Sequence, residues 1–251
     1  MSPTPPSSRS LPLDAEMEAL GRDLVRLDGG LGIFRLAHLL DALGERPTGT
    51  VLSIGSGGGL HESLLAHAFP DVRVVGVDRR APYAPPKQNL TFLEGDLLDP
   101  RFQESLPLAE FVYSIECLEH IDDDASVVRA AASRVAPGGL LYVQVPFASD
   151  AEQADPELCR VERENHEHVR PGYAGHQLAK LVSNAGLEPV SVAGAFWFPY
   201  QPLVWIAIEK YGPEPLAPHW REVLKIAELD VRPGLPASRN EATAIKILAR
   251  R

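Results

Sequence analysis

The stretch Val51-Leu52-Ser53-Ile54-Gly55-Ser56-Gly57-Gly58-Gly59 decides the fold, because a short apolar run meets four glycines in it. Residues 60–69, directly after it, are predicted to form a helix. Glycine allows positive φ and lets a ligand approach the backbone closely. The start of a helix adds free N–H groups and a partial positive charge. The stretch therefore predicts a strand, a tight turn and a helix that hold a nucleotide-like ligand, although plain loops are also glycine-rich.

Four further runs, rich in strand-forming residues and mostly separated by helical segments, follow along the chain: residues 72–78, 90–96, 111–117 and 139–145. Such alternation predicts a doubly wound, mostly parallel sheet with helices on both faces. Ligands bind these sheets beyond the carboxyl ends of the strands. Three acids stand at predicted strand ends: Asp78, Asp96 and Glu116. Asp78 follows the first glycine by about 20 residues, the spacing of a carboxylate that accepts hydrogen bonds from ribose hydroxyls.

The ordered set of these motifs resembles the class I S-adenosylmethionine-dependent methyltransferases, of the broad group that modifies small molecules. The matching segments lie between residues 48 and 192, in the family's order: residues 51–59, 75–78, 94–97, 114–121, 135–141, 167–170 and 181–187. Each motif alone is weak, whereas the ordered set is specific. The resemblance implies a seven-stranded Rossmann-like sheet flanked by helices, with a last strand near residues 242–249. It also implies S-adenosylmethionine as the cofactor.

The resemblance assigns roles to individual residues at the predicted edge of the sheet. The glycine-rich backbone is expected to meet the methionine part of the cofactor. Asp78 is expected to hold the ribose hydroxyls, and Asp96 with the Leu97 backbone the edge of the adenine. The complete set of expected cofactor-binding residues is Ser53, Gly55, Ser56, Gly57, Gly59, Asp78, Arg79, Asp96, Leu97 and Glu116.

Ser53 departs from the family's pattern. The family usually carries an acid at this position, two residues before the first glycine, where it meets the ammonium group of the cofactor. A serine hydroxyl accepts a hydrogen bond but has no charge, and a charged acceptor is worth about 1 kcal/mol more. We expect either weaker cofactor binding or compensation by another acid. The alternative is a catalytically silent protein that binds the cofactor as a regulatory or partner protein.

Three residues are candidates for catalysis: Glu116, His120 and His166. Methyl transfer needs alignment of the acceptor with the methyl group and often the removal of a proton. Glu116 is expected near the methyl group. His120 has an intrinsic pKa suited to a base, but its motif recurs in enzymes with different substrates, which favours a structural role. His166 is expected to face solvent or substrate beside His168, and no metal is expected because no ligand spacing supports a dedicated site.

Two other enzyme classes are disfavoured. The usual dehydrogenase fingerprint is G-x-G-x-x-G, whereas the glycines here alternate. The net charge of −10 argues against nucleic acid as the substrate, because phosphate binding needs basic patches. The Asn/Asp-Pro-Pro-Tyr/Phe motif of methyltransferases that act on amino groups of nucleic acids is also missing, and Ser114-Ile115-Glu116-Cys117 stands in its place.

The domain organisation is predicted as a disordered leader, residues 1–12, and a single methyltransferase domain, residues 13–251. The domain is divided into a helical cap, a core in two pieces and an insertion: residues 13–47, 48–195 with 241–251, and 196–240. The cap either covers the ligands or simply packs on the sheet. The insertion holds all three tryptophans, and aromatic side chains give large, rigid contact areas.

We interpret the insertion as a lid over a small, apolar or aromatic metabolite, of the kind found in secondary metabolism. Its alternatives are a small satellite core, the contact of a homodimer, or a membrane surface, which is less favoured because a basic helix face is absent.

Two cysteines are too few for a disulfide framework, and no apolar run is long enough to span a membrane. We therefore expect a cytoplasmic enzyme without nucleic-acid or membrane partners.

Overall fold

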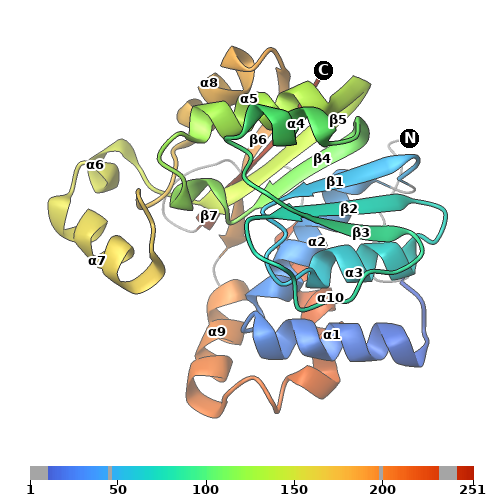
Figure 1. The fold of residues 1–251 in the computed structure, drawn as a ribbon. Coiled ribbons are helices and arrows are strands. Elements are labelled where there is room, and N and C mark those ends of the chain that lie inside the picture. The colour runs from blue at the N-terminus through green and yellow to red at the C-terminus, as the bar shows by residue number, and fades with distance from the viewer. Residues whose placement is uncertain (1–10, 45–46, 198–199, 232–241) are drawn as a thin grey trace, which may run out of the picture.

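The computed structural model describes residues 11–44, 47–197, 200–231 and 242–251. Seven strands form one sheet in the order β3-β2-β1-β4-β5-β7-β6 (Figure 1). Their bounds are β1 Thr50–Ile54, β2 Arg73–Asp78, β3 Leu90–Glu94, β4 Ala109–Ile115, β5 Val135–Pro146, β6 Glu188–Trp197 and β7 Ala242–Arg250. Only β7 runs antiparallel to its neighbours, β5 and β6. The predicted mostly parallel, seven-stranded sheet is confirmed.

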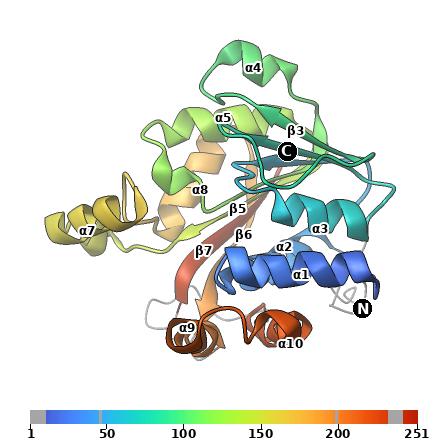
Figure 2. The same ribbon diagram turned by 60° about the horizontal axis from the view of Figure 1, so that its bottom comes forward.

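Helices cover both faces of this sheet (Figures 1 and 2). One face carries α1 Ala15–Leu27, α2 Leu31–Leu43, α3 Leu60–Ala68, α9 Tyr200–Tyr211 and α10 Trp220–Asp230. The other face carries α4 Pro100–Ser105, α5 Asp124–Arg134 and α8 Gly175–Asn184. Two further helices, α6 Asp150–Gln153 and α7 Pro156–His166, project to one side. Each face has its own apolar core, so the sheet is buried between two helical layers.

The start of β5 differs from the sequence prediction. The strand begins at Val135 rather than at Gly139, so it follows α5 without a loop. Val135 pairs with Ala109 and Leu140 pairs with Phe111, with a register shift on β4 between these two pairs. The extra residues of β5 are accommodated at this irregularity, as in a β-bulge.

The insertion between β6 and β7 contains α9, a short 3₁₀ helix (Ala217–His219) and α10. Its predicted start at residue 196 is wrong, because Phe196 belongs to β6 and is buried. Trp220 is fully buried against Gly21 of α1, where its ring leaves no room for a Cβ. These two aromatics therefore serve the core. Residues 1–10, 198–199 and 232–241, which include most of the predicted leader and parts of the predicted insertion, lie outside the described residues.

A buried polar chain connects the insertion to α2 and β7. The Nε2 of His38 lies 2.7 Å from an Asp230 oxygen, and the Nζ of Lys246 lies 2.8 Å from the Nδ1 of His38. Asp230 also accepts a hydrogen bond from the backbone N–H of Phe196. Since Lys246 donates to Nδ1, the neutral ring of His38 donates from Nε2 to Asp230. Burial and the charge of Lys246 lower the pKa of His38 to about 4.

This pKa makes stability depend on pH. The ordinary value is 6.5, so between pH 6.5 and about 4 the unfolded chain binds more protons than the folded one. The free energy of unfolding therefore falls as the pH drops, by about 2 kcal/mol between pH 7 and pH 5. We expect urea unfolding to show this loss in the wild type and a smaller loss in His38→Gln. Equal losses in the two proteins would contradict the assignment.

Candidate functional site

The glycine-rich turn connects β1 to α3 at the carboxyl edge of the sheet. The backbone N–H groups of Gly55 and Ser56 both donate to the Val77 carbonyl of β2, at 2.8 and 2.9 Å. Three glycines of the turn have positive φ: Gly55, Gly57 and Gly59. A Cβ on Gly55 would also overlap the side chain of Cys117. Gly55 is therefore required both by its backbone conformation and by the close approach of Cys117.

A cavity of about 220 Å³ lies beside this turn. It is lined by the turn itself, by the ends of β1 and β4, by the start of α3, by Tyr83, and by residues of α1, α2 and the connection between these two helices. The predicted cofactor-binding residues among its lining are Ser53, Gly55, Ser56, Gly57, Gly59 and Glu116. The predicted helical cap thus contributes directly to the site, through Leu24, Leu27, Asp28 and Arg35. The sequence predicted the cap but assigned none of these four side chains to the site.

Arg35 organises the charges on one side of the cavity. Its Nη1 donates to Asp28 at 2.7 Å, and its Nη2 donates to Glu116 at 3.1 Å. Burial raises the pKa of Glu116, and the neighbouring guanidinium opposes this shift. Glu116 also has a φ of 49°, which is uncommon outside glycine and asparagine. The backbone at the end of β4 is therefore turned so that the carboxylate of Glu116 reaches Arg35.

Glu62, in the first turn of α3, is an acid of the cavity that sequence reasoning missed. Its side chain is 2% exposed. The hydroxyl of Tyr113 donates to one of its oxygens at 2.5 Å, and its other oxygen has no hydrogen-bond partner among the described residues. Tyr113 of β4 pairs in register with Ser53 of β1, so the two side chains lie on one face. An acid shortly after the glycines, in a chain without one at position 53, was the available signal.

The other predicted acids lie at the carboxyl ends of β2 and β3. Asp78 accepts hydrogen bonds from the backbone N–H groups of Gly57 at 2.9 Å and Arg80 at 3.0 Å. Asp96 lies 3.7 Å from the Nε of Arg79, whose side chain is largely exposed. None of these acids is among the lining residues of the cavity, and Leu97 is buried in the apolar core of the opposite face. Asp78 nevertheless contacts the glycine-rich turn directly.

The predicted catalytic histidines lie apart from the cavity lining. His120 follows β4 and is exposed, and His166 is exposed at the end of α7. Both rings approach His168, with centroids 4.7 and 5.3 Å away.

Glu119, His120 and His168 offer ligand atoms within 4.8 Å of one another. Glu119 is buried, and neither of its oxygens has a hydrogen-bond partner among the described residues. Carboxylate and imidazole are common ligands of transition metals, so this cluster is where the described chain could hold one.

Comparison with protein families decides the identity of the fold. The model of a methyltransferase domain family matches residues 33–192, which is more than half of the chain. The chain belongs to the class I S-adenosylmethionine-dependent methyltransferases. This match covers the glycine-rich turn, Asp78 at the end of β2, Asp96 just beyond β3, and the segment with His120 and His168. The chain is therefore an enzyme of this family, and its cofactor is S-adenosylmethionine.

Curated relatives include methyltransferases of several specificities. A ubiquinone biosynthesis O-methyltransferase of Xanthomonas euvesicatoria pv. vesicatoria is 29% identical over 164 residues, which span 60% of this chain and 67% of that protein. The C-methyltransferase NovU of Streptomyces niveus is 32% identical over 188 residues, which span 67% of this chain and 40% of that protein. The chain thus covers less than half of NovU and about two thirds of the ubiquinone enzyme.

Solved structures of methyltransferases share the fold at low sequence identity. A geranyl diphosphate methyltransferase in complex with GPP and sinefungin has a TM-score of 0.61 and 14% identity. The match covers 86% of this chain and 77% of that one. Phosphoethanolamine N-methyltransferase 2 of Haemonchus contortus, in complex with S-adenosylmethionine, has a TM-score of 0.56 and 15% identity over 92% of this chain and 60% of that one. At this level of identity these matches support the fold alone.

The residues of the cavity fit the cofactor. S-adenosylmethionine carries a sulfonium, an ammonium and a carboxylate, and the cavity offers carboxylates and a guanidinium beside a glycine-rich turn. The Oε2 of Glu62, the Oε1 of Glu116 and the Nε of Arg35 are buried and have no hydrogen-bond partner among the described residues. Buried polar atoms of this kind are costly unless a ligand satisfies them.

We expect Asp78→Asn to weaken the binding of S-adenosylhomocysteine by about tenfold or more, because an ionised acceptor for the ribose hydroxyls is lost. Isothermal titration calorimetry measures the affinity, and circular dichroism shows that the variant is folded. Asp71→Asn, an exposed acid just before β2, is the matched control and should bind as the wild type does. Unchanged affinity in Asp78→Asn would remove Asp78 from the site.

Proposed function

We propose that this methyltransferase acts on an oxygen, nitrogen or carbon atom of a small, apolar or aromatic metabolite, in secondary metabolism. The observation that carries the proposal is the cavity beside the glycine-rich turn, in which charged side chains lie next to the backbone of four glycines. The bound cofactor supplies an electrophilic methyl group on a sulfonium. The protein has to bind the acceptor, orient it and exclude water.

The names of the relatives support a small acceptor. They include an O-methyltransferase of ubiquinone biosynthesis, a trans-aconitate 2-methyltransferase and a C-methyltransferase. The net charge of −10 also favours a small molecule over a nucleic acid. The described residues contain no helix with the length and apolar character that crossing a membrane requires. Both cysteines of the chain are free, in keeping with the expected cytoplasmic location.

Glu116 is the residue we place beside the acceptor. It lines the cavity, and its Oε1 is buried and has no hydrogen-bond partner among the described residues. Burial raises its pKa, which brings a carboxylate closer to the range of a general base. His120 and His166 stay candidates as proton acceptors for an acceptor molecule that enters from their side. Both side chains are exposed. Unchanged turnover in His120→Ala and His166→Ala would remove these two residues from the catalytic set.

The insertion remains the proposed lid. Its helix α9 packs on α2 and β6, and it exposes the large side chains of Leu203, Trp205 and Ile206. Exposed apolar groups of this size are suited to an apolar substrate or to a second copy of the chain. We therefore keep both the lid and the homodimer as proposals for this helix.

A screen for product tests the proposed function. The protein would be incubated with S-adenosylmethionine and a panel of small phenols, carboxylic acids and amines, and S-adenosylhomocysteine would be quantified by mass spectrometry. We expect acceptor-dependent product in the wild type and at least a tenfold lower rate in Asp78→Asn.

Tight binding of S-adenosylhomocysteine without turnover of any acceptor would favour the second candidate, a silent protein that binds the cofactor. Ser53, in place of the family's usual acid, is the specific observation behind that alternative. Measuring binding and turnover on the same preparation separates the two candidates.

A further inference from the structure

The cavity beside the glycine-rich turn holds more negative than positive side chains. Three carboxylates line it, those of Asp28, Glu62 and Glu116, whereas Arg35 is the one Lys or Arg among its lining residues in the described chain. Arg35 lies between Asp28 and Glu116 and donates to both. Glu62 takes no part in this cluster, and its hydrogen bond comes from the neutral hydroxyl of Tyr113. Glu62 is therefore the carboxylate of the cavity that lacks a cationic partner.

Burial makes this position demanding. Glu62 is 2% exposed, and its Oε2 has no hydrogen-bond partner among the described residues. A buried carboxylate with an unsatisfied oxygen is strongly disfavoured unless a donor meets it, and a charged donor does so best. No Lys or Arg from α3, β1 or β4 lines the described part of the cavity, and His61 of α3, which does line it, has its Nε2 3.0 Å from the Gly32 carbonyl. A ligand that carries a positive charge would supply the missing donor.

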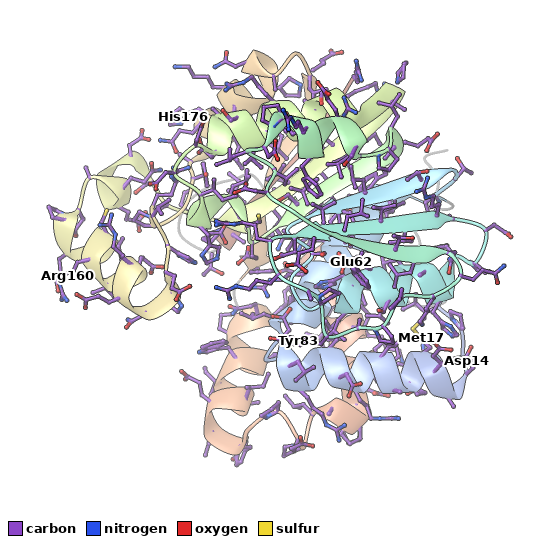
Figure 3. The ribbon with its side chains drawn as sticks, viewed as in Figure 1. Asp14, Met17, Glu62, Tyr83, Arg160 and His176 are labelled. Atoms are coloured by element: carbon purple, nitrogen blue, oxygen red, sulfur yellow. The ribbon has the colours of Figure 1, made fainter. Side chains whose placement is uncertain are left out.

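The location of Glu62 indicates which positively charged group of the ligand it meets. Ser53, at the position where the family usually has its acid, pairs in register with Tyr113 on the neighbouring strand, and Tyr113 holds Glu62. Ser53, Tyr113 and Glu62 all line the same cavity. In Figure 3, Glu62 and Tyr83 both lie on the side of the sheet that faces α1, and both line the cavity. The acid absent from the strand is thus matched by an acid on the adjoining helix.

We propose that Glu62 replaces the missing strand acid and binds the ammonium group of S-adenosylmethionine, with Tyr113 as its positioning residue. Arg35 completes the arrangement, because its unpartnered Nε can donate to the carboxylate at the same end of the ligand. Arg35 and Glu62 line the same cavity, and a cation together with an anion selects an α-amino acid group over ligands with a single charge. The inference rests on the assignment of this cavity to the cofactor.

Calorimetric titration with three ligands tests the proposal without any acceptor. S-adenosylhomocysteine carries the ammonium and the carboxylate, its deaminated analogue keeps only the carboxylate, and 5′-methylthioadenosine lacks the whole amino acid end. We expect Glu62→Gln to weaken the binding of S-adenosylhomocysteine by about 10- to 100-fold, because a charge-assisted hydrogen bond is lost. The other two ligands should change by less than about threefold, since they carry no ammonium.

Three further variants make the test specific. Glu104→Gln, an exposed acid of α4, is the matched control and should bind as the wild type does. Asp78→Asn should weaken S-adenosylhomocysteine and 5′-methylthioadenosine alike, because both contain the ribose. Ser53→Asp combined with Glu62→Gln returns an acid to the strand and should recover most of the lost affinity for S-adenosylhomocysteine alone.

Several outcomes would overturn the assignment. Unchanged affinity in Glu62→Gln, or equal weakening of all three ligands, would show that Glu62 does not bind the ammonium group. Tyr113→Phe should give a partial loss that is restricted to S-adenosylhomocysteine, and a uniform loss would contradict the positioning role. If Glu62→Gln does not fold, Glu62→Asp, which keeps the charge but shortens the side chain, gives the same comparison. If the wild type bound none of the ligands, the assignment of the cavity to the cofactor would itself fail.

Discussion

The site depends on the positive φ of Gly55 and on the pair of hydrogen bonds from Gly55 and Ser56 to Val77. These bonds hold the turn against β2, and they determine where α3 begins. The side chain of Cys117 packs against the same glycine, so the end of β4 is located by the same contact. One tight turn therefore sets the relative positions of three strands and one helix. A side chain on Gly55 would disturb all of them, because it would strain the backbone and displace Cys117.

The positions of the charged groups in the cavity depend on the elements that this turn holds together. Glu62 faces inward because it lies in the first turn of a helix that starts directly after the glycines. Glu116 reaches Arg35 because the chain turns at the end of β4 with positive φ. Neither contact involves neighbours in the sequence, since the Arg35–Glu116 pair is 81 residues apart and the Tyr113–Glu62 pair 51. The electrostatics of the site are thus a product of the topology of the sheet.

Much of the fold could be predicted from the sequence, because glycines and strand-ending acids mark local events. The succession of strands along the chain, the turn after β1 and the positions of Asp78 and Asp96 at strand ends needed only local patterns and family resemblance. Arg35 and Glu62 were missed because a charged residue on a helix is normally exposed, whereas α2 and α3 bury more than half of their residues. Likewise, the sequence does not distinguish a lid from a satellite core for the insertion, and in the structure Trp220 of this segment fills the core against Gly21. Such residues are recognised only when distant helices are packed together.

The helix α2 has one further consequence. It carries Arg35 on the wall of the cavity and His38, less than one turn later, in the buried chain to Asp230 of α10. The insertion, which we associate with acceptor choice, and the cavity, which we assign to the cofactor, thus meet on a single helix. A chimera that exchanges the insertion of this enzyme for that of a relative would have to bring a matching α2 with it. On the proposed roles of the insertion and of Arg35, acceptor specificity and cofactor affinity cannot be exchanged independently.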